Sequence, residues 1–353
     1  MVYENPQTIC SNPVQVVPKG NGYRLVRDFK AVNQQSEPVA APPTLLEEHA
    51  SAFAGTALFM MVNLNQGYWQ MPLAANSQEL FTFVTQKGLY TPTRMPQGVT
   101  NATSYFQGTL ERTLGDLVRR ICLVYVDEVI IWGRDVWELM DHFSWVAKNL
   151  MEVGLLVAAH KVTLYAREVK WCGKLYSGTG VRHDPERIRG LVEMRRPETV
   201  GELMQFLQAA NWMRLSLPNM AEAVSPLRAL LERKLKRTTR TMMVASRKVM
   251  TEEDWSEEIE ATSQSSRELL EDAVQLIFRK EAFWVLMFPD ASDLFWGGFL
   301  TQVPEEDLVS GMLVVDMAHF VSGGFKGSQL NWAVVDKEEF AILSVCRRLS
   351  YLL

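Results

Sequence analysis

The pattern of apolar and polar residues is clearest in the stretch Ile121–Trp132, I-C-L-V-Y-V-D-E-V-I-I-W. Two apolar, β-branched and aromatic runs flank Asp127 and Glu128, and runs separated by two residues predict a β-hairpin. Both expected turn residues are acidic, although a tight turn favours Asn-Gly or Asp-Gly. A cation would remove the repulsion between the carboxylates, and Mg²⁺ is the natural candidate because it prefers oxygen ligands. Taken alone, the stretch fits an acidic surface turn on a buried hairpin better.

Further strands are predicted on both sides of this hairpin. They are expected at Val14–Val17, from Tyr23, at Leu58–Leu64, at Phe81–Thr85 and Leu89–Thr93, within 164–181, and in a pair around Asp290. The strand at Leu58–Leu64 is apolar except for Asn63 near its end. Asn is depleted in strand interiors, so this residue needs a specific reason.

Apolar residues at helical spacing, together with capping residues, predict the helices. Helices are expected after Thr44, from Thr100 or Asn101 to Leu114, over Trp137–Gly154, Pro185–Met194 and Val200–Trp212, over 266–280, and over 332–349. Residues 233–265 join a basic cluster containing Thr and Ser to an acidic-polar run, and this composition is typical of a linker.

A second pair of carboxylates is expected in the C-terminal part. The run A-F-W-V-L-M-F-P-D-A-S-D predicts a strand that ends at Asp290, and the helix over 332–349 carries Asp336, Glu338 and Glu339. A strand-end aspartate and a nearby helix glutamate could share a metal ion.

Composition limits the class of protein. The 353 residues suggest two or three domains, and a hydrophobic content of 47% is enough to bury their cores. Because the net charge is −5, contacts with nucleic acid must come from local basic patches. The four cysteines are scattered, which favours reduced thiols and an intracellular protein, cytoplasmic or nuclear. No apolar run is long enough to cross a membrane, and no signal-peptide pattern is present.

Local basic patches occur in two places. Lys19, Arg24, Arg27 and Lys30 lie close together in the first predicted hairpin, and arginine-rich helices follow residue 181. Lys and Arg can hold phosphates, and a compact helical unit of this kind could contact the backbone of a duplex. The hairpin alone is better explained as a solvated basic surface, and the helices equally well as ordinary helices with charged faces.

Several motifs follow one another in a characteristic order. They are Y-R-L-V-R-D-F-K-A-V-N from Tyr23, V-N-L-N-Q-G-Y-W-Q from Val62, R-M-P-Q-G-V-T-N-A from Arg94, Y-V-D-E from Tyr125, W-C-G-K-L-Y-S-G-T-G-V-R-H-D-P-E-R from Trp171 and F-P-D-A-S-D from Phe288. Along nearly the whole chain, this order resembles the reverse transcriptase and RNase H region of a gypsy-class long-terminal-repeat retrotransposon polyprotein. Each motif alone is weak, whereas the ordered set is very specific.

The resemblance implies an α+β right-hand polymerase with fingers, palm and thumb, followed by a truncated RNase H-like α/β domain. Fingers and palm would occupy 1–180, thumb-like helices 181–232, a linker 233–265 and the partial RNase H-like domain 266–353. The implied activity is that of an RNA-directed DNA polymerase with Mg²⁺ or Mn²⁺ as cofactor. The implied partners are an RNA template, a DNA primer or duplex, and deoxynucleoside triphosphates (dNTPs), with no membrane.

The resemblance also implies roles for single residues. Asp127 would bind both catalytic metals, with Glu128 beside it and Asn63 at the position of the first family carboxylate. The nucleotide site would consist of Lys19 and Arg24 at the triphosphate, Tyr68 as the steric gate under the sugar, and Gln97 in the pocket. Asp290 and Glu338 would be the first two metal carboxylates of the RNase H part.

Two of the three polymerase carboxylates depart from the family pattern. Asn63 offers a neutral oxygen in place of a charge, and Glu128 is one methylene longer than Asp. A displacement of roughly an ångström can cost about 10²-fold in rate. Losing a charge at a metal pair costs several kcal/mol, or ~10³-fold and more.

The departures leave three hypotheses about function. The first is an RNA-directed DNA polymerase, impaired in this copy by Asn63 and Glu128. The second is a catalytically inactive remnant that keeps the fold and weak nucleic-acid binding, and the third is an unrelated binding module. The RNase H part ends before its remaining metal carboxylates, so no nuclease activity is expected from this chain alone.

Overall fold

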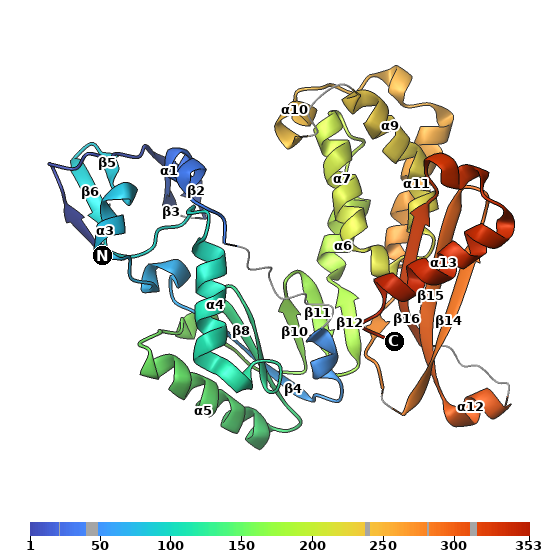
Figure 1. The fold of residues 1–353 in the computed structure, drawn as a ribbon, viewed down its shortest axis with the longest axis horizontal. Coiled ribbons are helices and arrows are strands. Elements are labelled where there is room, and N and C mark those ends of the chain that lie inside the picture. The colour runs from blue at the N-terminus through green and yellow to red at the C-terminus, as the bar shows by residue number, and fades with distance from the viewer. Residues whose placement is uncertain (21, 40–48, 237–240, 281, 311–315) are drawn as a thin grey trace. The chain divides into compact units, whose positions relative to one another are not determined.

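The computed structural model describes residues 1–20, 22–39, 49–236, 241–280, 282–310 and 316–353 (Figure 1). The chain divides into two compact units. Unit 1 comprises Met1–Ala52 and Thr56–Val169, and unit 2 comprises Phe53–Gly55 and Lys170–Leu353. The predicted domain limits at residues 180 and 232 would divide the chain into smaller parts than these two units.

Unit 1 is built around a four-stranded antiparallel sheet with the strand order β7–β8–β4–β9. Its strands are β7 (Cys122–Tyr125), β8 (Glu128–Gly133), β4 (Leu58–Asn63) and β9 (Thr163–Ala166). The helices α4 (Ala102–Leu114) and α5 (Val136–Glu152) pack against it, and alternate strand residues such as Met60 and Val62 share their core. Because strand residues alternate between faces, Asn63 belongs to the face opposite these helices.

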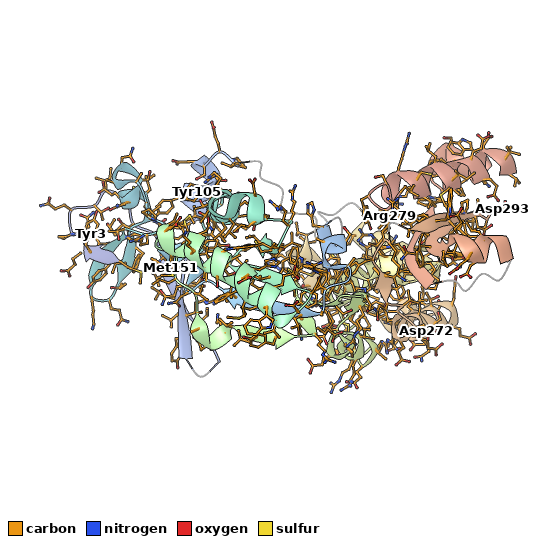
Figure 2. The ribbon with its side chains drawn as sticks, turned by 90° about the horizontal axis from the view of Figure 1, so that it is seen from below. Tyr3, Tyr105, Met151, Asp272, Arg279 and Asp293 are labelled. Carbon is orange, nitrogen blue, oxygen red and sulfur yellow. The ribbon has the colours of Figure 1, made fainter. Side chains whose placement is uncertain are left out.

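The outer surfaces of α4 and α5 point away from this core. Tyr105 on α4 and Met151 on α5 are exposed to solvent (Figure 2). On their inner surfaces, the two helices bury residues such as Phe106, Leu110 and Leu139. Apolar residues at helical spacing predicted α5, whereas α4 was predicted from a capping residue at Thr100 or Asn101.

The rest of unit 1 consists of short β-structures and helices. The elements are a three-stranded sheet in the order β1 (Val2–Glu4), β6 (Gly88–Pro92) and β5 (Phe83–Thr85), a hairpin of β2 (Val14–Lys19) and β3 (Gly22–Arg27), and the helices α1 (Lys30–Gln35) and α3 (Ala75–Gln78). Both predicted hairpins are confirmed, whereas α1 was not predicted. The helix expected after Thr44 begins at residues outside the described ranges.

Unit 2 begins with a four-stranded sheet and a group of helices. The sheet contains, in order, β10 (Glu168–Trp171), β11 (Lys174–Ser177), β12 (Gly180–His183) and β13 (Leu276–Ile277). The helices are α6 (Pro185–Val192), α7 (Val200–Trp212), α8 (Met220–Ala223), α9 (Ser225–Leu235), α10 (Met242–Ser246) and α11 (Glu257–Glu271). Their apolar faces form one helical core.

The C-terminal part of unit 2 is a three-stranded antiparallel sheet covered by a helix. Its strands, in order, are β14 (Phe283–Ala291), β15 (Phe295–Pro304) and β16 (Asp316–Gly324). The helix α13 (Val334–Arg348) packs on one face, and a short helix α12 (Glu305–Ser310) follows β15 (Figure 1). The predicted strand through Asp290 and the predicted C-terminal helix are confirmed.

The prediction of a linker at 233–265 is wrong for the residues that the structure describes. Helix α10 and the start of α11 lie in this range, and Ala245, Met250 and Ile259 are buried in the helical core. A Cβ atom on Gly201 of α7 would lie 2.8 Å from the Cα atom of Ser246, so α7 and α10 touch closely. Among the charged residues that indicated a linker, Arg233 and Lys236 are exposed, whereas Lys234 pairs with the buried Asp254. The helix predicted over 266–280 instead covers Glu257–Glu271.

No helix in the described part of the chain combines the length and the apolarity needed to cross a membrane.

Candidate active site

The hairpin predicted at Ile121–Trp132 is confirmed, but its turn lies one residue earlier than expected. Tyr125 pairs with Glu128, so Val126 and Asp127 are the two turn residues and Glu128 is the first residue of β8. Val126 has a φ of 55°. A β-branched side chain rarely adopts this left-handed conformation, so the turn holds strain that its surroundings must sustain.

The strand pairing brings the three predicted polymerase-site residues together. Asn63 lies directly opposite Glu128 across β4 and β8. The carbonyl oxygen of Asp127 accepts a 2.8 Å hydrogen bond from the backbone N–H of Leu64, the residue after Asn63. Asn63 is buried, while Asp127 and Glu128 are half-buried. A buried Asn at the end of β4 thus has a polar partner on the next strand.

The charge on Glu128 is disfavoured at this place. Its pKa is raised above the ordinary value of 4.5, first by burial and then by the neighbouring charge of Asp127. A hydrogen bond from the side chain of Asn63 and the positive charge of Lys161 oppose this shift. Since a carboxylate only accepts hydrogen bonds, the amide nitrogen of Asn63 is the donor. Asn63 therefore supplies part of the stabilisation that a cation would give.

The donor set of the site fits a divalent cation. Asp127 and Glu128 offer two carboxylates whose repulsion a cation would relieve, and the side-chain oxygen of Asn63 is a further hard donor. Within the described residues, no group of three or more His, Cys, Asp or Glu side chains comes together. The site therefore offers two carboxylates where the family pattern expects three.

Gly67 lets the backbone approach Asp127 closely. It begins the short helical turn Gly67–Gln70, and an added Cβ atom would lie 3.4 Å from the Cβ of Asp127. Gly67 also has a φ of 36°, a conformation that L side chains rarely adopt. The turn is thereby held against the aspartate, and the two following aromatic residues, Tyr68 and Trp69, lie beside the site.

A cleft of about 630 Å³ opens beside Asp127 and collects most of the predicted nucleotide-site residues. Arg24, Tyr68, Gln97 and Asp127 all line it. The hydroxyl of Tyr68 lies 2.9 Å from the hydroxyl oxygen of Thr103, and its ring meets the edge of Phe106 at a centroid distance of 5.5 Å. Tyr68 is thus fixed against α4, with its ring at the wall of the cleft.

Lys19, the remaining predicted nucleotide-site residue, lies on β2. Its backbone pairs with Gly22 at the end of β2, and its side chain lies outside the described part of the structure. Its role stays a prediction.

Several lining residues were not assigned to the site from the sequence. They are Arg27, Trp69, His160 and Lys161. Lys161 lies near enough to Glu128 to lower its pKa. Arg27 was noted only as one of a group of basic residues, and the position of His160 and Lys161 depends on the return of the chain to β9, which the sequence pattern does not fix.

Gln107 of α4 holds the strained turn and was also missed. Its side-chain oxygen accepts a 2.6 Å hydrogen bond from the backbone N–H of Val126, and its amide nitrogen donates to the carbonyl of Val124 at 3.0 Å. The amide nitrogen also donates to Glu111 at 2.8 Å. Gln107 is buried between the apolar residues of α4. A polar residue on the inner face of a predicted helix was the available signal.

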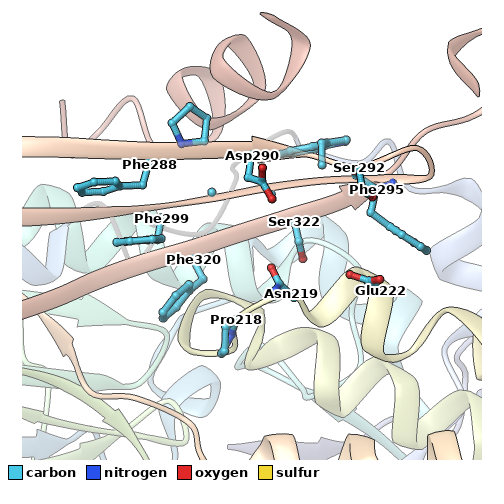
Figure 3. Close-up of a pocket in the computed structure, with 14 residues that line it drawn as sticks. Pro218, Asn219, Glu222, Phe288, Asp290, Ser292, Phe295, Phe299, Phe320 and Ser322 are labelled. Carbon is cyan, nitrogen blue, oxygen red and sulfur yellow. Dashed lines mark hydrogen bonds between the residues drawn. The ribbon is translucent and has the colours of Figure 1, made fainter. Parts of the chain in front are cut away.

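The two residues predicted for the RNase H part come from different sides of β14. Met287 contacts Cys346 of α13, so Asp290 lies on the face opposite α13 by strand alternation. On that face, Phe288, Phe299 and Phe320 line a pocket of about 350 Å³, and Asp290 points toward Asn219 and Glu222 (Figure 3).

Glu338 projects from α13 and is half-buried. Among the described strands, β14 has a neighbour on one side only, because the sheet order is β14–β15–β16. An ion shared by Asp290 and Glu338 would therefore have to lie beyond the free edge of β14. Their common metal site stays a prediction.

Comparisons with known proteins find a family model and several relatives that match this chain. Residues 17–174 match the family model described as reverse transcriptase (RNA-dependent DNA polymerase). The chain is 29% identical over 209 residues to the retrovirus-related Pol polyprotein from transposon gypsy of Drosophila melanogaster, which covers 59% of this chain and 20% of that polyprotein. It is 25% identical over 339 residues to the Pol polyprotein from transposon 297 of the same species, covering 94% of this chain and 30% of the relative.

A yeast relative and two solved structures extend the likeness over the whole chain. The transposon Tf2-3 polyprotein of Schizosaccharomyces pombe is 24% identical over 343 residues, covering 97% of this chain and 24% of the polyprotein. The foamy viral protease-reverse transcriptase shares the fold at 21% identity, with TM-scores of 0.79 for its RNA/DNA hybrid complex and 0.81 for its double-stranded DNA complex. Each covers 99% of this chain, and the chain covers 44% and 69% of them. The chain spans less than a third of the length of these curated relatives.

Replacing Gln107 should loosen the turn that carries Asp127. We expect Gln107→Met to lower the free energy of unfolding of unit 1 by about 1–3 kcal/mol, because the buried N–H of Val126 loses its acceptor. Urea-induced unfolding measures this change. Arg112→Met, at an exposed position of the same helix, is the matched control. Equal stability of the two variants would contradict the role of Gln107.

Gln107→Glu gives a second test of the same contact. The ionised carboxylate still accepts from Val126 but cannot donate to the carbonyl of Val124. Burial near that carbonyl should raise the pKa of the new carboxyl in the folded state. Stability should then be restored in acid, where the protonated group donates again, and fall as the pH rises through that raised pKa. A loss of stability that is the same at every pH would argue against this arrangement of hydrogen bonds.

Glu128 should make the stability of unit 1 depend on pH. Because its pKa is raised in the folded state, its contribution is present below its ordinary pKa of 4.5 and is lost as the pH rises through the raised value. We expect Glu128→Gln to become more stable than the parent chain as the pH rises through this window. The variant should remain more stable at neutral pH. Thermal unfolding followed from acid to neutral pH measures the difference. Glu152→Gln removes an exposed carboxylate from the same unit and serves as the control. Parallel profiles of stability against pH for the parent chain and Glu128→Gln would refute the expectation.

Proposed function

We infer that this chain, whose residues 17–174 form a reverse transcriptase domain like those of retrotransposon Pol polyproteins, is the polymerase region of an RNA-directed DNA polymerase. The observation that carries the proposal is the meeting of Asp127 with the end of β4, at a cleft that Arg24, Tyr68 and Gln97 also line. An aspartate beside a cationic cleft suits the transfer of a nucleotide from its triphosphate.

The cleft residues have distinct tasks in this proposal. Arg24, with Lys19 as a second cation, binds the triphosphate through charge-assisted hydrogen bonds. Tyr68, fixed by Thr103 and Phe106, lies under the sugar and excludes a 2′-hydroxyl by its bulk. Gln97 is exposed at the mouth of the cleft and contacts the incoming nucleotide.

Asp127 and Glu128, with the side-chain oxygen of Asn63, would hold Mg²⁺ or Mn²⁺. When bound, such ions activate the primer 3′-hydroxyl and neutralise the triphosphate. The protein itself must keep the carboxylates close together and ionised. Gln107 and the pairing of β4 with β8 hold them in place, and Lys161 favours the ionised form of Glu128.

Asn63 impairs this site in two ways. It removes the negative charge that a carboxylate would supply to the cations, and its amide nitrogen donates to Glu128, engaging an oxygen that a cation would need. Loss of one charge from a metal pair costs several kcal/mol of transition-state stabilisation, or ~10³-fold in rate. The longer side chain of Glu128 acts on the same ions, so its cost does not simply add.

The proposed partners are an RNA template, a DNA primer and dNTPs. The fold is shared with a foamy viral enzyme whose structures hold double-stranded DNA or an RNA/DNA hybrid. The four cysteines are scattered along the sequence, and from this spacing we propose a reducing compartment such as the cytoplasm or the nucleus.

A second candidate function is that of a catalytically inactive remnant which still binds nucleic acid weakly. The same Asn63 favours it, because a carboxylate at this place has been replaced by a neutral amide that satisfies Glu128 without a cation. The two candidates differ in whether restored carboxylates restore polymerisation.

Primer extension on a DNA-primed RNA template, with Mg²⁺ or Mn²⁺, separates the two candidates. We compare the parent chain, Asn63→Asp, Glu128→Asp and the double variant, with Asp127→Asn as the background. We expect the parent to be barely above this background and Asn63→Asp to gain about 10²–10³-fold, since it returns a charge to the metal site. The double variant should be fastest, by less than the product of the single gains.

A parent chain that extends primers as fast as the double variant would contradict the impairment. If the double variant binds the primed template but does not extend it, the remnant is the correct reading and damage lies outside these two positions. Binding is followed separately through its dependence on salt.

A further inference from the structure

The guanidinium of Arg27 lies over two aromatic rings at the wall of the cleft. It is the last residue of β3, and its guanidinium carbon lies 4.9 Å from the ring centroid of Trp69 and 4.3 Å from that of Phe83. Trp69 comes from the turn that touches Asp127, and Phe83 from β5. The two rings restrict the movement of the guanidinium, whose N–H groups still need hydrogen-bond acceptors.

The side chain of Arg27 has no hydrogen-bonding or ion-pairing partner among the described residues. Its Nε–H is buried without an acceptor, and burial lowers the pKa of the guanidinium. Arg134 of the same unit, in contrast, is fully engaged by Glu138 at 2.8 Å. Aromatic faces compensate part of the lost hydration, by about 0.5–2 kcal/mol, but they offer nothing to the in-plane N–H groups. A half-buried cation without such a partner favours the binding of an anion that comes from outside the chain.

The charges around Arg27 point to the same class of ligand. Arg24, Arg27 and Lys161 line the cleft together, and among the described residues Asp127 is the one carboxylate in its lining. Three cations against one anion give the cleft a positive potential, which concentrates anionic ligands. The guanidinium fork matches the geometry of a phosphate, because two of its N–H groups can donate to two phosphate oxygens at once.

We propose that Arg27 is a phosphate-binding residue of this cleft, positioned by Trp69 and Phe83 so that its N–H groups donate to a phosphate of bound nucleotide or nucleic acid. The assignment rests on the proposed function, since it concerns a ligand of the same cleft. The phosphate has two possible sources, the triphosphate of a dNTP and the backbone of the template–primer duplex, and the experiment below distinguishes them. If Arg27 instead serves packing alone, its replacement changes stability but neither affinity.

The test measures two equilibria with the full chain. One is the binding of dTTP with Mg²⁺, and the other is the binding of a DNA-primed RNA duplex over a range of salt concentrations. The variants are Arg27→Met, which removes the charge, and Arg27→Lys, which keeps the charge but cannot stack and donate as a fork. Arg134→Met removes the same charge from a side chain that is already paired and does not line the cleft. Thermal unfolding of each variant verifies that it is folded.

We expect Arg27→Met to weaken one of the two equilibria by about tenfold or more, with Arg27→Lys in between and Arg134→Met unchanged. If the duplex supplies the phosphate, the slope of log affinity against log salt should also fall by about 1 in Arg27→Met and recover in Arg27→Lys. If the nucleotide supplies it, only the dTTP affinity should change.

Parent-like affinities and salt slope in both Arg27 variants would overturn the assignment while leaving the proposed function intact. A parent chain that binds neither dTTP nor the duplex would overturn the proposed function itself, and the assignment of Arg27 with it. An equal loss in Arg27→Met and Arg134→Met would show a general effect of charge and would also refute a specific contact.

Discussion

The repulsion between the carboxylates of Asp127 and Glu128 is the interaction on which the site depends. Burial strengthens it, and both effects raise the pKa of Glu128. Two groups of the protein oppose it, the amide of Asn63 and the charge of Lys161. In a site built for two divalent cations, the ions would provide this compensation and a third carboxylate would help to hold them. Here an amide takes the place of that carboxylate and satisfies Glu128 directly. Under the proposed function, the chain therefore keeps the residues of a metal site together while reducing their charge.

The rest of unit 1 keeps these two carboxylates together. The register of β4 and β8 sets Asn63 against Glu128, and the bond from Leu64 ties the turn to the end of β4. Gln107 holds Val126 in a conformation that a β-branched residue avoids, at a cost of about 1–3 kcal/mol. Each hydrogen bond contributes only about 1 kcal/mol net, so several are needed to maintain the strained turn. Strained turns of this kind cluster at functional sites, which agrees with a present or former function of this turn.

The sequence predicted most elements of unit 1 and the neighbourhood of the site, but not its details. Periodicity identified the hairpin, whereas the placement of Glu128 on β8 depends on a pairing register that alternation alone cannot fix. Gln107 and Arg27 were missed because a bond to a strained backbone and contact with distant aromatic rings arise only in the folded chain. The linker prediction failed because charged helix faces hid Ala245 and other buried positions. The residues at Asn63 and Asp127 were found through motif order, which carries information that composition does not.

The binding of Mn²⁺ to the parent chain and to Asn63→Asp, measured at neutral pH by electron paramagnetic resonance, tests the central claim most directly. It requires neither template nor turnover, so it isolates the charge of the site from any other damage. If the amide has replaced a metal ligand, Asn63→Asp should bind Mn²⁺ at least about tenfold more tightly, or about 1.4 kcal/mol. Equal affinities for the two chains would contradict the claim that the loss of charge at Asn63 weakens this site.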